Sequence, residues 1–244
     1  LGPLSNAPDS SAVRAVITQD PPGQPPGSRF DALPAVYSVR HTDHLRDGDV
    51  VAISPKDGFV RTIYRPDSAH NTVFITERCN SNCLMCSQPP KDVDDTDYLF
   101  GVNMQLLNFI DPGAANLTIT GGEPTLLGDR LFHLVSEMKT RLPSTHVHML
   151  TNGRSFAWKD TTRALAAVGH PRLSLGIPLY SDYAPDHDYI VQAKGAFDQT
   201  VLGLHQLARW CLAVEIRVVL HKLTIPRLTN LAEFIARNFP FVTH

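Results

Sequence analysis

Three of the four cysteines lie within eight consecutive residues. They are Cys79, Cys83 and Cys86, whereas Cys211 is far from them in the sequence. In a reducing compartment, clustered thiols are more often ligands of a metal ion or an iron–sulfur cluster than disulfide partners. Three thiolates at this spacing can bind three irons of a cubane cluster and leave the fourth iron open, as a reactive cluster requires. The spacing therefore predicts a 4Fe–4S cluster with one open coordination position.

A structural zinc site is the alternative for these cysteines, with a distant fourth ligand such as His70. Structural zinc sites usually take their ligands from two short halves, and the sequence shows no second half. Cys211 lies in an apolar context and is expected to be a buried small residue.

A second candidate site is the Gly-Gly-Glu-Pro sequence at 121–124. Gly121 and Gly122 lack a Cβ atom, so the backbone there can come close to a ligand. The Glu123 carboxylate can accept hydrogen bonds from an ammonium group. Asn152, in a Thr-Asn-Gly sequence, can contact a cofactor or a substrate, although a simple Asn-Gly turn explains it equally well.

Short β-rich runs must position these motifs. After residue 70 they alternate with segments of helical periodicity, and the predicted strands are 72–76, 116–120, 146–151, 172–180 and 213–220. This strict alternation predicts an α/β fold with a parallel sheet and right-handed crossovers. Five such units without a dinucleotide fingerprint favour a TIM-like barrel, complete or partial. We expect a partial (β/α)6 barrel whose sixth strand is truncated, because it would begin at 241–244.

Apolar residues at helical spacing predict the intervening helices. One predicted helix runs from Asp160, as its cap, to Val168, with Gly169 just past its end. The other apolar stripes are Leu99, Val102, Leu106 and Phe109; Leu131, Leu134, Val135 and Met138; Phe197, Val201, Leu204 and Ala208; and Leu228, Leu231, Ala232 and Ile235.

The chain is expected to have three parts. Residues 1–35 are rich in proline and glycine and are predicted to be a flexible leader. Residues 36–69 are predicted to form a small β-hairpin element, with strands at 49–53 and 59–64 and an Asp-Gly turn between them. Residues 70–244 form the predicted barrel, which we expect to be incomplete at its C-terminus.

Overall composition gives no sign of a membrane or nucleic-acid partner. The chain has 22 Lys and Arg against 24 Asp and Glu, a net charge of −2 and 43% hydrophobic residues. It contains no apolar run of about 18 residues that could span a bilayer, and its start lacks the apolar core of a signal peptide. These features predict a globular cytoplasmic protein.

The two motifs together resemble those of the radical S-adenosylmethionine superfamily. In this chain the C-x-x-x-C-x-x-C loop follows the first predicted barrel strand and the Gly-Gly-Glu-Pro motif follows the second. The resemblance covers residues 70–244. It implies that Cys79, Cys83 and Cys86 bind a 4Fe–4S cluster whose open iron chelates S-adenosylmethionine. Reductive cleavage would then release a 5'-deoxyadenosyl radical, and the reaction would need an electron donor.

The same resemblance suggests further cofactor contacts. Gly121, Gly122 and Glu123 would bind S-adenosylmethionine, and Met85 could pack beside the cluster or the adenine. Pro178 stands where a ribose-binding serine is common, so Ser181, Ser174 or a backbone group would take that role. Arg217 could hold the cofactor's carboxylate if it points into the barrel, or pair with an acidic neighbour if it points outward. His187 and Asp188 are expected to be structural anchors rather than acid–base catalysts.

Residues 76–91, 177–181 and 220–222 are similar to one subfamily, the His-Xaa-Ser system radical maturases. This similarity implies a peptide or protein substrate with His-Xaa-Ser repeats and a second radical maturase as a partner. Two alternatives remain. One is a radical enzyme acting on a small molecule or nucleic acid, although the near-neutral charge disfavours RNA. The other is a non-catalytic protein whose cysteines hold zinc or a structural cluster.

Overall fold

The computed structural model describes residues 16–17, 35–37, 39, 42–54 and 59–242. The chain divides into two compact units, Leu1–Ser68 and Ala69–His244, which are described separately. Most of the predicted leader, the predicted Asp-Gly turn and residues 243–244 lie outside the described residues. Within the described residues, no helix combines the length and the apolar character needed to cross a membrane.

The first unit contains two small sheets. Strands β1 (Val16–Ile17) and β2 (Ala35–Val36) form a short parallel pair, which the sequence did not predict. Strands β3 (Val50–Ser54) and β4 (Phe59–Tyr64) pair antiparallel, as expected for the predicted hairpin strands at 49–53 and 59–64, with an irregularity in register between Val50 and Val51.

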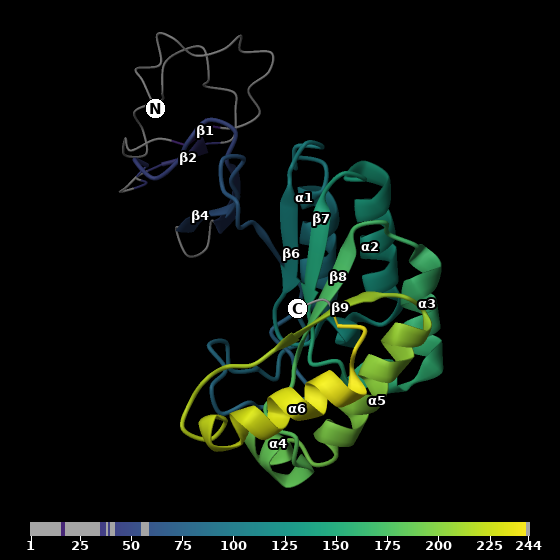
Figure 1. Cartoon of the computed structure of the whole chain (residues 1–244). Coiled ribbons are helices and arrows are strands. Elements are labelled where there is room, and N and C mark those ends of the chain that lie inside the picture. The colour runs from purple at the N-terminus through teal and green to yellow at the C-terminus, as the bar shows by residue number, and fades with distance from the viewer. Residues whose placement is uncertain (1–15, 18–34, 38, 40–41, 55–58, 243–244) are drawn as a thin grey trace, which may run out of the picture. The chain divides into compact units, whose positions relative to one another are not determined.

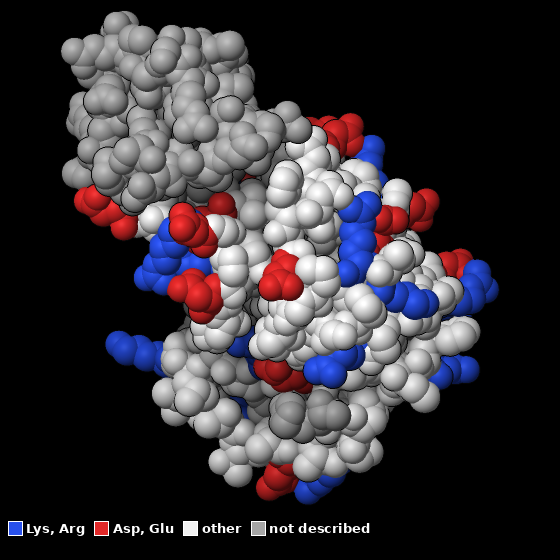
Figure 2. Space-filling model, turned by 90° about the horizontal axis from the view of Figure 1, so that it is seen from above, with Lys and Arg blue, Asp and Glu red and all other residues white. Residues whose placement is uncertain are grey.

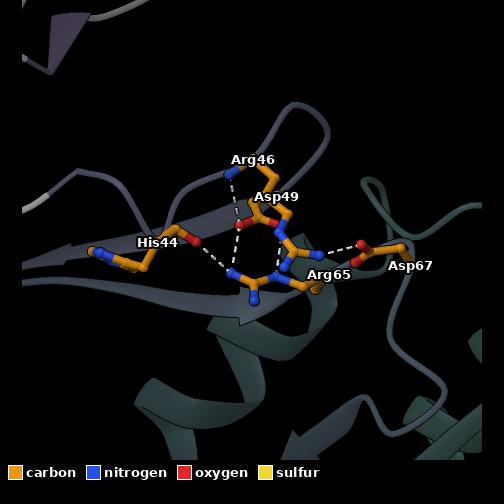
Figure 3. Close-up of polar contacts among 5 residues, drawn as sticks. All are labelled: His44, Arg46, Asp49, Arg65 and Asp67. Atoms are coloured by element: carbon orange, nitrogen blue, oxygen red, sulfur yellow. Dashed lines mark hydrogen bonds and ion pairs between the residues drawn. The ribbon is translucent and has the colours of Figure 1, made fainter.

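The Asp49 carboxylate, whose side chain is 2% exposed, joins the two ends of this hairpin (Figure 3). Asp49 accepts hydrogen bonds from Arg65 Nε at 3.1 Å, from Arg65 Nη2 at 2.9 Å and from the backbone N–H of Arg46 at 3.1 Å. Arg65 also donates to the carbonyl of His44 at 2.7 Å, and Arg46 pairs with Asp67. The hydrogen bonds from Arg65 are the main reason that the pKa of Asp49 lies below its usual value.

The second unit is built on a five-stranded parallel sheet (Figure 1). Its strands stand in chain order and each pairs in parallel with the next: β5 (Thr72–Phe74), β6 (Asn116–Thr120), β7 (His146–Leu150), β8 (Leu173–Pro178) and β9 (Ala213–Arg217). The helices are α1 (Thr96–Leu106), α2 (Asp129–Arg141), α3 (Lys159–Val168), α4 (Ala184–Val191), α5 (Ala196–Arg209) and α6 (Leu228–Asn238). This arrangement confirms the predicted α/β partial barrel.

The two faces of the sheet differ in polarity because side chains alternate along each strand. The face covered by helices is apolar and fully buried, with exposed fractions of at most 1% for Leu117, Ile119, Val147, Met149, Leu175, Ile177 and Val214. The predicted stripe of α2 packs there, since all four of its apolar residues are 0% exposed. The opposite face, called the inner face below, carries Thr118, His146, His148, Ser174, Gly176, Glu215 and Arg217.

Several local predictions were wrong. Phe109 is 64% exposed because α1 ends at Leu106, before the stripe reaches it. Trp158 rather than Asp160 caps α3, and Asp160 lies in its first turn. Cys211 is exposed because it reverses the chain between α5 and β9 with a φ of 54°. Residues 241–242 are not in a strand.

Candidate active site at the cysteine loop

The cysteine loop leaves the carboxyl end of β5 and is held in place by α4, a helix that the sequence did not predict. The backbone N–H groups of Asn82 and Leu84 donate to the carbonyls of Val191 and Ile190 at 3.0 and 2.9 Å. Cys83 and Met85 pack, partly buried, against a hydrophobic cluster formed by Tyr180, Ile190, Val191 and Ala196. The last turn of α4 therefore fixes the middle of the loop.

The three thiols are free and differ in exposure. Cys79 and Cys83 are half-buried, and Cys86 is exposed. Burial raises the pKa of Cys79, and it raises the pKa of Cys83 to about 11, with a further contribution from the neighbouring thiolates. Three free thiols on one loop match the donor set of a 4Fe–4S cluster with an open iron. Among the described residues, no three His, Cys, Asp or Glu side chains are arranged to hold a single metal ion, and this includes the three cysteines.

The Gly-Gly-Glu sequence positions the start of the cysteine loop through the backbone. Gly122 N–H donates to the carbonyl of Thr76 at 2.6 Å, and Glu123 N–H donates to the carbonyl of Arg78 at 2.8 Å. A Cβ atom on Gly122 would lie 1.8 Å from the Arg78 oxygen, and one on Gly121, whose φ is 140°, would lie 2.8 Å from the Thr76 oxygen. The space left by these glycines is thus occupied by the protein's own backbone, directly before Cys79, and the expected contact of Gly121 and Gly122 with S-adenosylmethionine stays a prediction.

Glu123 is a buried carboxylate that ties the loops after β6 and β7 together. Its side chain is 1% exposed. Oε1 accepts hydrogen bonds from Thr125 N at 3.0 Å, Thr125 Oγ1 at 2.7 Å and Thr151 Oγ1 at 2.7 Å, and Oε2 accepts one from Asn152 N at 2.7 Å. The predicted contact with the cofactor's ammonium group stays a prediction, and only Oε2 has a lone pair left to accept it.

Asn152 and Arg154 reach the cysteine loop from the end of β7. Asn152 Nδ2 lies 2.5 Å from Asn80 Oδ1 and 4.0 Å from Cys79 Sγ. Arg154 Nη1 donates to the Asn80 carbonyl and, at 3.1 Å, to Ser81 Oγ. The sequence did not single out Arg154, whose only signal was its place just after the Thr-Asn-Gly turn. Its charge counteracts the rise in the pKa of Cys83, as expected for a cation beside thiolates.

The remaining predicted cofactor contacts are spread around the loop. Ser181 is 2% exposed and its Oγ accepts a hydrogen bond from Tyr183 N at 3.1 Å, so it closes the turn into α4. Arg217 lies over the inner face and also near an acid, with Nε 3.6 Å from Glu215 Oε1, so the two predicted orientations are combined. Their contacts with ribose and carboxylate, like that of Met85 with the cluster or adenine, stay predictions.

His187 and Asp188 are structural anchors, as predicted. Asp188 accepts hydrogen bonds from the N–H groups of Gly195 and Phe197 at 2.5 and 2.8 Å and so caps α5. His187 is 1% exposed, and its Nδ1 accepts a hydrogen bond from Tyr180 N at 3.2 Å. Burial lowers the pKa of His187 to about 4.

A cavity of about 550 Å³ opens beside Cys79. Its volume is within the usual range of small-molecule sites, which is about 300–1,000 Å³. Residues from four parts of the chain line it: Arg78, Cys79, Asn80, Ser81 and Asn82; Pro90, Lys91 and Asp92; Leu126; and Gln192. The cavity therefore places a space of ligand size next to the first predicted cluster ligand.

Comparison with known proteins places this site in a family. The model of the radical SAM superfamily matches residues 73–234. Among curated proteins, the chain is 28% identical over 174 residues to a GTP 3',8-cyclase of Campylobacter jejuni subsp. jejuni serotype O:2, covering 66% of this chain and 50% of that protein. It is 26% identical to a GTP 3',8-cyclase of Helicobacter pylori, covering 62% and 46%. The chain thus spans about half the length of the curated relatives it matches.

Solved structures show the same fold. Streptococcus suis SuiB bound to S-adenosylmethionine matches with a TM-score of 0.56 and 16% identity over 71% of this chain and 39% of that one. Native anSMEcpe with bound S-adenosylmethionine matches with a TM-score of 0.55 and 16% identity over 69% and 48%. The family match spans well over half of the chain and includes the cysteine loop. The chain belongs to the radical S-adenosylmethionine superfamily, whose members bind a 4Fe–4S cluster and S-adenosylmethionine.

Proposed function

We propose that Cys79, Cys83 and Cys86 hold the cluster and that the enzyme uses S-adenosylmethionine to abstract a hydrogen atom from its substrate. The observation that carries this proposal is the set of three free thiols on one loop, whose start is fixed by the Gly-Gly-Glu motif. When bound, the cluster and S-adenosylmethionine supply the electron and the radical for this chemistry.

The chain's own residues position these groups. Glu123 fixes the loop after β7, and Asn152 and Arg154 on that loop hold the residues next to Cys79. Met85 packs against the hydrophobic cluster that contains Tyr180 and Ile190, and it helps to exclude water from that side of Cys83. A cytoplasmic location fits these roles, because the thiols must stay reduced to bind iron.

For the substrate, the stronger candidate is a small molecule of the purine nucleotide class. It is supported by the similarity to GTP 3',8-cyclases, which extends over about two thirds of this chain. The second candidate is a peptide or protein with His-Xaa-Ser repeats, modified together with a second radical maturase. It is supported by the local similarity of residues 76–91 to the maturases of that system. Both candidates require an electron donor.

Anaerobic reconstitution tests the cofactor proposal. With iron, sulfide and dithionite, the wild-type protein should become brown and convert S-adenosylmethionine into 5'-deoxyadenosine. Cys83→Ala should lose both properties, because a thiolate ligand is missing. Cys211→Ala is the matched control, since this cysteine is exposed and lies outside the loop, and it should retain both. Tightly bound zinc without an iron–sulfur chromophore would contradict the proposal.

The two substrate candidates are separated by supplying each to the reconstituted enzyme. One arm contains GTP, and the other contains a co-expressed peptide with His-Xaa-Ser repeats. Mass spectrometry of both reports which one changes in mass in proportion to the 5'-deoxyadenosine formed. A change in the peptide alone would overturn the nucleotide proposal, and a change in GTP alone would overturn the peptide proposal.

A further inference from the structure

The inner face of the sheet carries a connected row of polar side chains. In a complete barrel such positions are mostly filled by bulky branched aliphatic residues. Here His148, Glu215 and Arg217 occupy them, and their side chains are 16%, 32% and 50% exposed. Exposure rises toward the carboxyl end of the strands, where the cysteine loop begins. The row therefore reaches the end of the sheet from which the cysteine loop also leaves.

Gly176 allows this row to form across the central part of the sheet. A Cβ atom at this position would lie 2.8 Å from His148 Nε2 and 3.0 Å from Arg217 Cδ. Any larger residue would push these two side chains apart, because real Cβ contacts are longer than this. The absence of a side chain in β8 thus lets a residue of β7 and a residue of β9 come together above it.

A hydrogen-bonded serine fixes the histidines of this row. Ser174 Oγ lies 2.8 Å from His146 Nε2 and 2.9 Å from His148 Nδ1. On its other side, His148 Nε2 lies 3.7 Å from Glu215 Oε2. His148 Nε2 is buried and has no hydrogen-bond partner among the described residues. Because a carboxylate favours a proton on the nitrogen that faces it, we expect Nε2 to carry the proton and Nδ1 to accept the hydroxyl proton of Ser174. In that arrangement the hydroxyl oxygen accepts the Nε2 proton of His146.

Glu215 lies between His148 and Arg217 in this row, but neither of them makes a hydrogen bond to its carboxylate. Its carboxylate lies 3.7 Å from His148 Nε2 and 3.6 Å from Arg217 Nε, and both distances are longer than a hydrogen bond. The neutral His148 ring and the Arg217 guanidinium thus flank the carboxylate, while its oxygens keep their capacity to accept hydrogen bonds. A carboxylate arranged in this way can bind an N–H donor that enters the half-barrel.

The carboxyl end of the row is linked to the cysteine loop through the segment that follows β8. Leu179 donates its N–H to the Arg217 carbonyl at 3.1 Å. The next residue, Tyr180, belongs to the hydrophobic cluster against which Cys83 packs. A substrate bound along the inner face would therefore extend toward the proposed site of hydrogen abstraction.

We propose that Glu215 binds an N–H group of the substrate, and that His148, Ser174 and His146 are positioning residues that orient it. This inference rests on the proposed function and names a specificity-determining contact within the same site. N–H donors are present in a guanine ring and in a peptide, so the same chemistry serves either substrate candidate.

The functional test measures coupling, defined as modified substrate formed per 5'-deoxyadenosine, with GTP and with the His-Xaa-Ser peptide in separate arms. Glu215→Gln keeps the size of the side chain but removes its charge, and it should lower the coupling at least tenfold and raise the KM for the substrate. Glu215→Asp should recover part of the loss. Glu233→Gln, an exposed glutamate of α6, is the matched control and should behave as the wild type. Wild-type coupling in Glu215→Gln would overturn the inference.

A second measurement tests the positioning residues without any substrate. Long-range ¹H–¹⁵N spectra of the wild-type protein should show His148 as the neutral tautomer protonated on Nε2. Ser174→Ala should change the signals of both His146 and His148. A proton on Nδ1 of His148 in the wild type would overturn the inference. If the wild type converts neither substrate, the substrate proposal fails while this measurement still decides the arrangement. If it produces no 5'-deoxyadenosine, the proposed function fails.

Discussion

At the scale of single residues, the position of the first cysteine depends on a missing side chain. Gly122 packs so closely against the Arg78 carbonyl that a Cβ atom would overlap it at 1.8 Å. Two backbone hydrogen bonds, from Gly122 N–H to the Thr76 carbonyl and from Glu123 N–H to the Arg78 carbonyl, hold the end of β6 to the start of the cysteine loop. The residue after Arg78 is Cys79, so any displacement of the Arg78 backbone also moves this predicted cluster ligand.

Gly122→Ala should therefore displace Arg78 and Cys79. We expect less iron bound after reconstitution and a free energy of unfolding lower by about 1–3 kcal/mol, as for other overpacked positions. Gly101→Ala is the matched control, because Gly101 lies within α1 with nothing within 4 Å of its added Cβ. That change should bind iron normally and stabilise the helix by up to about 1 kcal/mol. Iron analysis and urea unfolding would measure both effects, and equal iron contents would refute the argument.

At the scale of elements, the short helix α4 connects the cysteine loop to α5. Its last residues accept hydrogen bonds from the loop, and its Asp188 accepts them from the first turn of α5. The residue at the N-cap position of α5 is Gly195, which has no side chain to cap the helix. A carboxylate from the preceding helix takes over this role and also complements the helix dipole.

Asp188→Ala should destabilise the second unit by about 1–2 kcal/mol, because two N–H groups at the start of α5 lose their acceptor. Glu233→Ala removes an exposed carboxylate that pairs with Arg237 and should cost less than about 0.5 kcal/mol. Chemical denaturation at neutral pH compares the two variants. Equal losses of stability would show that Asp188 is not the cap of α5.

At the scale of the whole molecule, the described residues on one face show no concentration of a single charge sign (Figure 2). On the face seen in Figure 2, the Lys and Arg side chains of the described residues are interspersed with Asp and Glu, in keeping with a net charge of −2. The dependence of stability on pH should then come from individual buried groups. His187 is the clearest case, because burial lowers its pKa from 6.5 to about 4.

Neutral His187 stabilises the folded protein only at the higher pH values. Between pH 6.5 and about 4 the unfolded chain binds a proton at His187 and the folded protein does not. The contribution of His187 to the free energy of unfolding is therefore fully present above pH 6.5 and is lost as the pH falls toward 4. The shift corresponds to about 3 kcal/mol. His187→Asn, which keeps an acceptor for Tyr180 N–H, should flatten this part of the profile. Urea unfolding at a series of pH values measures it, and parallel profiles for the two proteins would contradict the assignment.

Sequence alone was sufficient for the features that depend on local pattern. Short β-rich runs between segments of helical periodicity located the five strands, and helical spacing placed all four core residues of α2. The spacing of Cys79, Cys83 and Cys86 predicted the cluster-binding loop, and the family match supports it. These features repeat over a few residues, so a single segment contains the whole signal.

Only the tertiary structure decided how segments far apart in the chain meet. It showed that the clearance at Gly122 is occupied by Arg78, that Ser181 is buried in a turn, and that Arg154 holds the cysteine loop. It also brought His148, Gly176 and Glu215 together from three neighbouring strands. The physical reason is that close packing and hydrogen bonding depend on distances in space, and the register of a parallel sheet sets those distances between residues that no local pattern connects.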